Sequence, residues 1–136
     1  MKNNISISVE VVYSPKHSSE TQFFYIYFIT MHNLGTQSAQ LLRRHFYIKN
    51  AHGEQQEIEG DGVVGEHPVI APEQIYRYHS GVPISFPPGT MHGNYTFQAA
   101  DGTEFNAEIP VFDLLEPAGY VPANTSRLEP NKRVLN

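Results

Sequence analysis

The 136-residue sequence contains no cysteine and no tryptophan. Without cysteine there is no disulfide, and no thiolate can act as a nucleophile or bind a metal. The longest apolar run, FFYIYFITM, is nine residues long and ends at Met31, whereas a membrane-spanning helix needs about 20. The N-terminal segment alternates and includes Glu10, which is not the pattern of a signal peptide. We therefore expect a cytoplasmic protein without membrane insertion.

Positive charge is also scarce, with nine lysines and arginines against fourteen aspartates and glutamates. The formal net charge of −5 predicts no nucleic-acid partner, because such partners require a basic surface. The seven histidines show no HxH, HxxxH or HExxH spacing, and no serine lies in a GxSxG motif. The sequence therefore predicts no catalytic residues, no metal site and no cofactor, and we expect a protein that is not an enzyme.

Apolar residues alternate with polar ones along most of the chain, which is the period of half-buried strands. Strands are expected over residues 5–13, 22–33, 41–50, 55–60, 74–81, 91–100 and 103–112, with a proline-rich loop over 83–90. About seven strands without an amphipathic helix predict an all-β fold over residues 1–115: a two-sheet antiparallel sandwich of immunoglobulin-like or fibronectin type III-like kind. The polar segment 116–136 is expected to be a loosely ordered tail.

The segment PGTMHGNY, residues 88–95, is similar to the entry of a tyrosine corner in such sandwiches. In that motif a tyrosine hydroxyl bonds to backbone a few residues upstream. We therefore expect Tyr95 to be buried, with its hydroxyl satisfied by a backbone group.

The segment EGDGVVGEHP, residues 59–68, contains glycines in the spacing GxGxxG. In dinucleotide-binding folds a helix follows these glycines and holds the phosphate at its N-terminus. Here two β-branched residues between Pro68 and Pro72 follow instead, and they disfavour a helix. The leading interpretation is structural: the glycines form a bend or bulge where the chain crosses between the two sheets.

A small-anion site remains the alternative interpretation of the same segment. Backbone N–H groups in a loop can bind phosphate without a helix. The candidates for such a pyrophosphate or nucleotide site are Gly60, Gly62, Gly65, Arg43 and Arg44.

Arg43 and Arg44 are adjacent in an expected strand, so their side chains should point to opposite faces. We expect one of them to face solvent and the other to pair with a carboxylate such as Glu57 or Glu66. Arg77 is a further possible source of positive charge for the anion site.

The expected strand 22–33 is apolar on both faces, although one face of a strand in a small sandwich normally meets water. Phe24, Ile26 and Phe28 share the face that does not alternate into the core. They predict a contact surface for a protein partner or for a second copy of the chain. The competing interpretation is that a loop or the C-terminal tail covers them.

Five segments together resemble the bacterial ApaG proteins, and they occur in the family's order: LLRRHFYI (41–48), GDGVVGEHPVIAP (60–72), YHSGVPI (78–84), GTMHGNYTF (89–97) and FNAEIPVF (105–112). The resemblance covers most of residues 5–115. The chain departs from the usual pattern at two positions. Glu73 stands where the family commonly has glycine, and Phe46 stands where it often has tryptophan.

The resemblance implies a fibronectin type III-like sandwich. It also implies a partner-binding module, because similar domains occur in eukaryotes within an F-box protein and a DNA polymerase delta-interacting protein. The bacterial proteins are linked by genetics to cobalt and magnesium efflux. The resemblance supplies no catalytic residue. We therefore expect a non-enzymatic protein-interaction module.

Overall fold

The computed structural model describes residues 2–117. Eight strands and one short 3-10 turn, η1 (Pro15–His17), make up these residues. The strands are β1 (Ile5–Ser14), β2 (Phe23–Asn33), β3 (Ala39–Lys49), β4 (Gln55–Asp61), β5 (Val69–Ile70), β6 (Ile75–Ile84), β7 (Gly89–Ala99) and β8 (Glu104–Leu114). Most of the predicted tail, residues 116–136, lies outside the described part of the chain.

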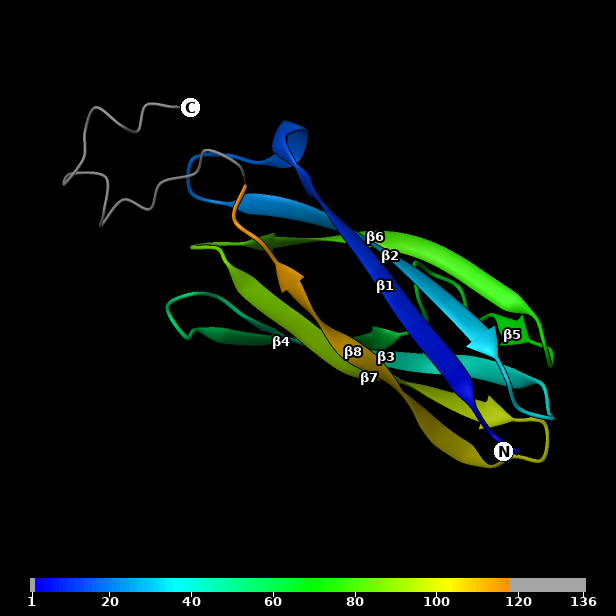
Figure 1. The fold of residues 1–136 in the computed structure, drawn as a ribbon. Coiled ribbons are helices and arrows are strands. Elements are labelled where there is room, and N and C mark those ends of the chain that lie inside the picture. The colour runs from blue at the N-terminus through cyan, green and yellow to red at the C-terminus, as the bar shows by residue number, and fades with distance from the viewer. Residues whose placement is uncertain (1, 118–136) are drawn as a thin grey trace, which may run out of the picture.

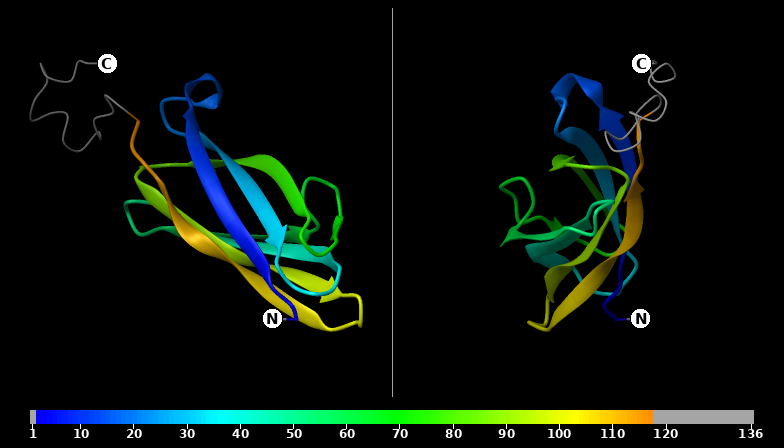
Figure 2. Two further views of the ribbon diagram at one scale, coloured as in Figure 1. Left: turned by 45° about the vertical axis from the view of Figure 1, so that its right-hand side comes forward. Right: turned by 90° about the vertical axis from the view of Figure 1, so that its left-hand side faces the viewer.

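The strands form two antiparallel sheets that face each other (Figure 1). The three-stranded sheet has the order β1-β2-β6. The five-stranded sheet has the order β4-β3-β7-β8, and β5 pairs with the start of β3. The turned views in Figure 2 show β1 beside β8, where the two sheets meet along one side.

This architecture confirms the predicted all-β, two-sheet sandwich. The one loop that differs is the proline-rich segment 83–90, because β6 extends through Pro83 to Ile84 and β7 begins at Gly89. Proline is tolerated at that position because β6 is an edge strand, in which a missing N–H leaves no neighbouring carbonyl without a donor.

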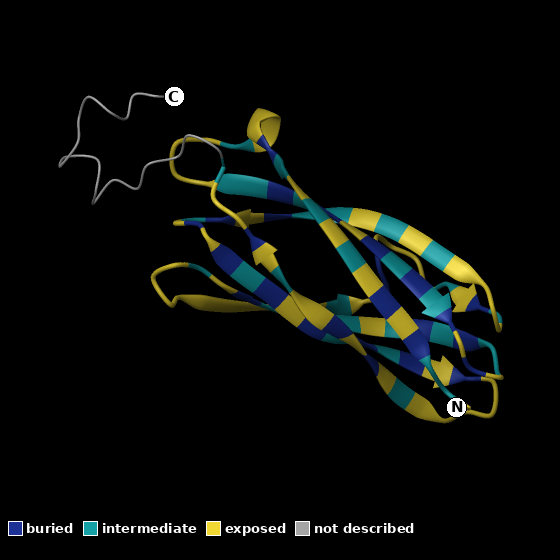
Figure 3. Cartoon of the chain, in the orientation of Figure 1, coloured by how far each residue is buried: buried dark blue, intermediate teal, exposed yellow. Residues whose placement is uncertain are grey.

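The core consists of alternate residues from both sheets, and Figure 3 marks these buried positions in dark blue along the strands. Tyr27 of β2 contacts Phe46 of β3 with ring centroids 5.5 Å apart, and Tyr95 meets Phe46 edge-on at 6.0 Å. Phe46 is 1% exposed. A phenylalanine therefore fills a central position of the core.

Tyr95 is fully buried, as predicted, but the expected backbone partner of its hydroxyl is wrong. The hydroxyl lies 2.5 Å from the hydroxyl of Tyr78, which β6 brings from the opposite sheet. Burial raises the pKa of both phenols, and for Tyr95 the neighbouring Tyr78 hydroxyl raises the pKa further. The pair thus acts as a neutral hydrogen bond that joins the two sheets.

The glycine segment does not carry the chain between the sheets, so that part of the structural interpretation is wrong. β4 before it and β5 after it both pair with β3, and the segment bends the chain along a single sheet. The crossing comes later, at a turn in which the Gln74 N–H donates to the Ala71 carbonyl at 3.0 Å. Glu73 sits in that turn with φ +72, a conformation that favours glycine.

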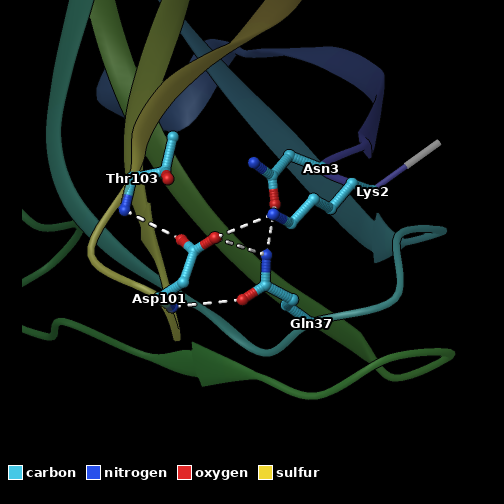
Figure 4. Close-up of polar contacts among 5 residues, drawn as sticks. All are labelled: Lys2, Asn3, Gln37, Asp101 and Thr103. Atoms are coloured by element: carbon cyan, nitrogen blue, oxygen red, sulfur yellow. Dashed lines mark hydrogen bonds and ion pairs between the residues drawn. The ribbon is translucent and has the colours of Figure 1, made fainter.

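A polar network closes one end of the sandwich (Figure 4). The Asp101 carboxylate, in the β7–β8 turn, lies 3.0 Å from the Lys2 ammonium and accepts a hydrogen bond from the Thr103 N–H. The Gln37 side chain accepts from the Asp101 N–H at 3.1 Å. The Thr103 hydrogen bonds, and then Lys2, hold the pKa of Asp101 well below its usual range.

Candidate functional site

No helix follows the GxGxxG segment. The residues after Gly62 form a tight turn in which Val63 and Glu66 exchange two backbone hydrogen bonds of 2.9 and 2.8 Å. Val63 points into the core and is fully buried, whereas Val64 is 66% exposed. A phosphate site of the dinucleotide-binding kind needs a helix N-terminus, and this turn provides none.

Each of the three glycines has its own structural reason. A Cβ on Gly60 would lie 2.7 Å from the Arg44 guanidinium, so the missing side chain leaves room for that arginine. Gly62 has φ +62, and a Cβ there would lie 2.2 Å from the Glu66 carbonyl oxygen. Gly65 has φ +77 with open space around it.

Arg43 and Arg44 point to opposite faces of β3, as the alternation predicts. Arg44 lies on the inner face with Gly60 and Tyr95, and its guanidinium donates to the carbonyls of Asp61 and Gly62 at 3.1 and 2.9 Å. Arg44 therefore fastens the turn to β3.

Arg43 faces outward and pairs with Glu104 of β8 at 3.2 Å. The prediction that the inner arginine pairs with Glu57 or Glu66 is therefore wrong, because Arg44 bonds to backbone carbonyls and the outward-facing Arg43 makes the ion pair. β8, a neighbour on the far side of β7, supplies the acid.

Several backbone N–H groups of the proposed anion site already donate hydrogen bonds within the chain. The N–H groups of Gly62, Val63 and Glu66 donate to backbone carbonyls, the first of them to Leu42 at 2.9 Å. A hollow of about 330 Å³ does lie beside Gly60, but Glu59 and Asp61 line it together with both arginines. Two carboxylates in one hollow oppose an anion, so the small-anion interpretation stays a prediction.

The outer face of β2 carries Phe24, Ile26 and Phe28, as the sequence predicts. Phe28 is 41% exposed, and Ile26 is half-buried. Phe24 is partly covered by the chain itself, since its ring lies over Gly81 and contacts the His17 ring of η1 at 5.4 Å. A loop residue therefore shields one member of the predicted surface and leaves Phe28 open.

A hollow of about 570 Å³ lies across this face. Two rows of paired residues form it, Glu10–Phe28–His79 and Ser8–Thr30–Arg77, which run across β1, β2 and β6. The short hydroxyl side chains of the second row leave a depression beside the Phe28 ring. Arg77 and Glu10 form no ion pair within residues 2–117.

The outer face of the five-stranded sheet differs, because several of its polar and charged side chains contact one another. Arg43 pairs with Glu104, and both ring nitrogens of His45 lie 3.2 Å from carboxylates, those of Glu57 and Glu59. Part of the charge on this face is therefore paired within the chain.

Residues 2–117 form neither a cluster of metal-binding side chains nor a helix that could span a membrane. No group of three or more histidine and acidic side chains in this range could hold a metal ion. The same residues include no helix long and apolar enough to span a bilayer.

The family follows from comparison with known proteins. The family model described as the ApaG domain matches residues 13–99, more than half of the chain. The chain belongs to the ApaG family. Protein ApaG of Acidithiobacillus ferrooxidans is 48% identical over 112 residues, which cover 81% of this chain and 88% of that protein. Protein ApaG of Proteus mirabilis is 43% identical over 117 residues, covering 85% and 94%.

Solved structures agree with the ApaG fold. The crystal structure of an ApaA protein from Bordetella pertussis superposes with a TM-score of 0.82 at 34% identity, covering 86% of this chain and 97% of that one. The names of these ApaG and ApaA relatives state no ligand, partner or reaction.

The sequence suggested Arg77 only as a source of positive charge near the glycine segment, and it gave no reason to single out His79. The structure puts both on the outer face of β6, beside Phe28. Pro83 was the signal that could have identified β6 as an edge strand, because proline within a strand is confined to sheet edges and bulges.

Proposed function

We propose that this ApaG chain is a non-enzymatic protein-binding domain that presents the outer face of the β1-β2-β6 sheet to a protein partner. The observation that carries the proposal is the exposed apolar centre of that face: Phe28 is 41% exposed and Val12 is 49% exposed, beside a hollow of about 570 Å³. Exposed aromatic side chains next to a concavity are typical of interaction surfaces.

Covering this centre would contribute roughly 1 kcal/mol for each of the two side chains, since each still exposes almost half of its surface. The unpaired Arg77 and Glu10 at its margins would add specificity more than affinity. Such a surface suits a moderate and reversible association.

The family resemblance implies a link to cobalt and magnesium efflux. A small domain of this kind acts on cation homeostasis through the partner that it binds, in the cytoplasm. A second copy of the chain is the other partner that the apolar face would fit.

Site-specific photo-crosslinking in cells tests the proposal. Replacing Phe28 by the photoreactive p-benzoylphenylalanine should give a discrete adduct with a protein. The matched control is the same replacement at Val111, which is 64% exposed on the five-stranded sheet and should give none. No adduct from position 28, or equal adducts from both positions, would refute the binding face.

Small-anion binding near Gly60 is the second candidate function. The hollow lined by Arg43 and Arg44 supports it, and the engaged amides of Gly62 and Val63 weigh against it. Titration of the ¹⁵N-labelled chain with pyrophosphate to about 10 mM tests it, because even a weak site shifts its amide resonances at that concentration.

A further inference from the structure

β6 forms a free edge of the three-stranded sheet. It pairs with β2 alone, and no strand in residues 2–117 pairs with its other side. The opposite edge of this sheet, β1, lies beside β8 instead (Figure 2). A strand of ten residues thus offers one row of backbone groups to an incoming chain.

The register decides which residues of β6 offer these groups. Asn33 donates its N–H to the Gln74 carbonyl at 3.0 Å, and the β2–β6 ladder continues without a shift to Ile84. Even-numbered residues of β6 therefore bond to β2, and odd-numbered residues point their N–H and C=O groups to the free edge. Pro83 agrees, since its missing N–H falls on the free side.

The side chains of the same odd-numbered residues stand on the outer face. Arg77 and His79 are both exposed there, and His79 also contacts the Phe28 ring at 5.6 Å between centroids. Neither makes an ion pair within residues 2–117. The edge thus combines unpaired backbone groups with one guanidinium and one imidazole side chain.

The core side of this edge is also incompletely covered. Tyr76 and Tyr78 of β6 are half-buried, although their β2 neighbours Met31 and Ile29 are at most 1% exposed. In a strand that pairs with this edge, every second side chain would point inward and lie beside Tyr76 and Tyr78. Apolar side chains fit that position because it borders the core.

We propose that β6 receives an extended segment of a partner protein as an additional strand, with acidic side chains beside Arg77 and His79 and apolar side chains over Tyr76 and Tyr78. Main-chain hydrogen bonds supply much of the affinity in this mode of recognition, and the alternating side chains supply selectivity.

A second copy of β6 is the less favoured occupant. Antiparallel pairing of two β6 strands would bring Arg77 and His79 of both chains to one seam, and none of the residues 75–84 is acidic. Like charges facing each other across strands are destabilising. The inference rests on the proposed function, since it names the kind of segment that the protein-binding face receives.

The test uses the full chain, labelled with ¹⁵N, and the blocked heptapeptide acetyl-TVEVDVT-amide as the probe. Its valines alternate with the two acids, as the proposed strand requires. Addition to about 5 mM should shift the amide resonances of Arg77 and His79 and slow their hydrogen exchange about fivefold or more. The acetyl-TVKVKVT-amide control should bind about tenfold more weakly.

Charge reversal supplies the second arm. Arg77→Glu should weaken binding of the acidic peptide about tenfold and strengthen binding of the lysine peptide, because the charge at this position changes sign. The matched control, Arg43→Glu on the other sheet, should leave both affinities unchanged. Both arginines are exposed, so neither variant should prevent folding.

Three outcomes would overturn the inference: no shift at Arg77 and His79 at the highest peptide concentration, equal binding of both peptides, or shifts that map to the five-stranded sheet. Crosslinking from Phe28 reports separately on the binding face. If crosslinking succeeds and the peptides fail, strand addition is refuted and the proposed function stands.

Discussion

The glycine turn, residues 60–66, and the edge strand β6 make opposite use of their polar groups. The turn carries a spacing familiar from phosphate-binding proteins, yet its amides at Gly62, Val63 and Glu66 bond to its own chain and Arg44 caps its carbonyls. β6 carries no recognisable motif, yet its outer edge and Arg77 have no partner in residues 2–117. The turn thus uses its polar groups within the fold, whereas the edge of β6 leaves a row of backbone groups open to another chain.

The glycine turn gives the largest expected effect. Gly62→Ala should lower the free energy of unfolding by about 3 kcal/mol. Two costs add up: alanine is strained at this positive φ, and its Cβ would clash with the Glu66 carbonyl oxygen. Gly65→Ala is the matched control, with the same strain and open space, and should cost about 1 kcal/mol. Urea unfolding measures both. Equal losses of stability for the two variants would contradict the claim that close contact with the Glu66 carbonyl requires glycine at position 62.

The inner face of β6 differs from its open edge, because there the Tyr78 hydroxyl is hydrogen-bonded to the Tyr95 hydroxyl. Tyr95→Phe leaves the Tyr78 hydroxyl without its partner and should cost about 1–2 kcal/mol. The double variant Tyr78→Phe with Tyr95→Phe should cost less than the sum of the two single variants. Additive costs in a double-mutant cycle would show that the two hydroxyls do not interact.

The turn that leads from β5 into β6 holds a strained residue. Glu73→Gly should raise the free energy of unfolding by roughly 0.5–1 kcal/mol, since relief of the positive φ outweighs the added freedom of the unfolded chain. A rise in the urea midpoint with an unchanged slope would support this. A fall would mean that the Glu73 side chain makes a stabilising contact.

Much of this pattern could be predicted from the sequence, and the misses have physical causes. Period-two alternation identified the strands and the exposed Phe28, because burial of one face dictates that period. The partner of Arg43 could not be predicted, because Glu104 lies two strands away across β7. The Tyr95–Tyr78 bond was missed for the same reason: it joins two sheets, and sequence separation carries no information on sheet stacking.

The edge character of β6 depends on strand order, which alternation does not reveal. Only Pro83 marked it in advance. The structural role of Gly60 was likewise hidden, since it depends on the path of the Arg44 side chain beneath β4.

Asp101 lies at one end of the sandwich, away from the glycine turn and from the middle of β6. Its lowered pKa makes the free energy of unfolding depend on pH. The pKa of Asp101 is lowered in the folded state, so its contribution to stability is present above the unfolded value of about 4 and is lost as pH falls through the folded value. Asp101→Asn should therefore destabilise the protein at neutral pH, with a difference that shrinks below about pH 4. A difference independent of pH would assign the effect to turn geometry alone.

Arg77 should show the smallest effect on folding. Arg77→Glu should change the free energy of unfolding by less than about 0.5 kcal/mol, because the side chain is exposed and has no ion pair in residues 2–117. Thermal or urea unfolding measures this. A large loss of stability would mean that Arg77 serves the fold, and the contrast with the glycine turn would disappear.

The most direct measurement compares two titrations of one ¹⁵N-labelled sample. With pyrophosphate, the amides of residues 60–65 should stay in place at about 10 mM; with the acidic heptapeptide, those of Arg77 and His79 should move at about 5 mM. The reverse pattern, glycine amides that shift with pyrophosphate and a silent β6, would contradict the assignment of binding to the edge of the three-stranded sheet.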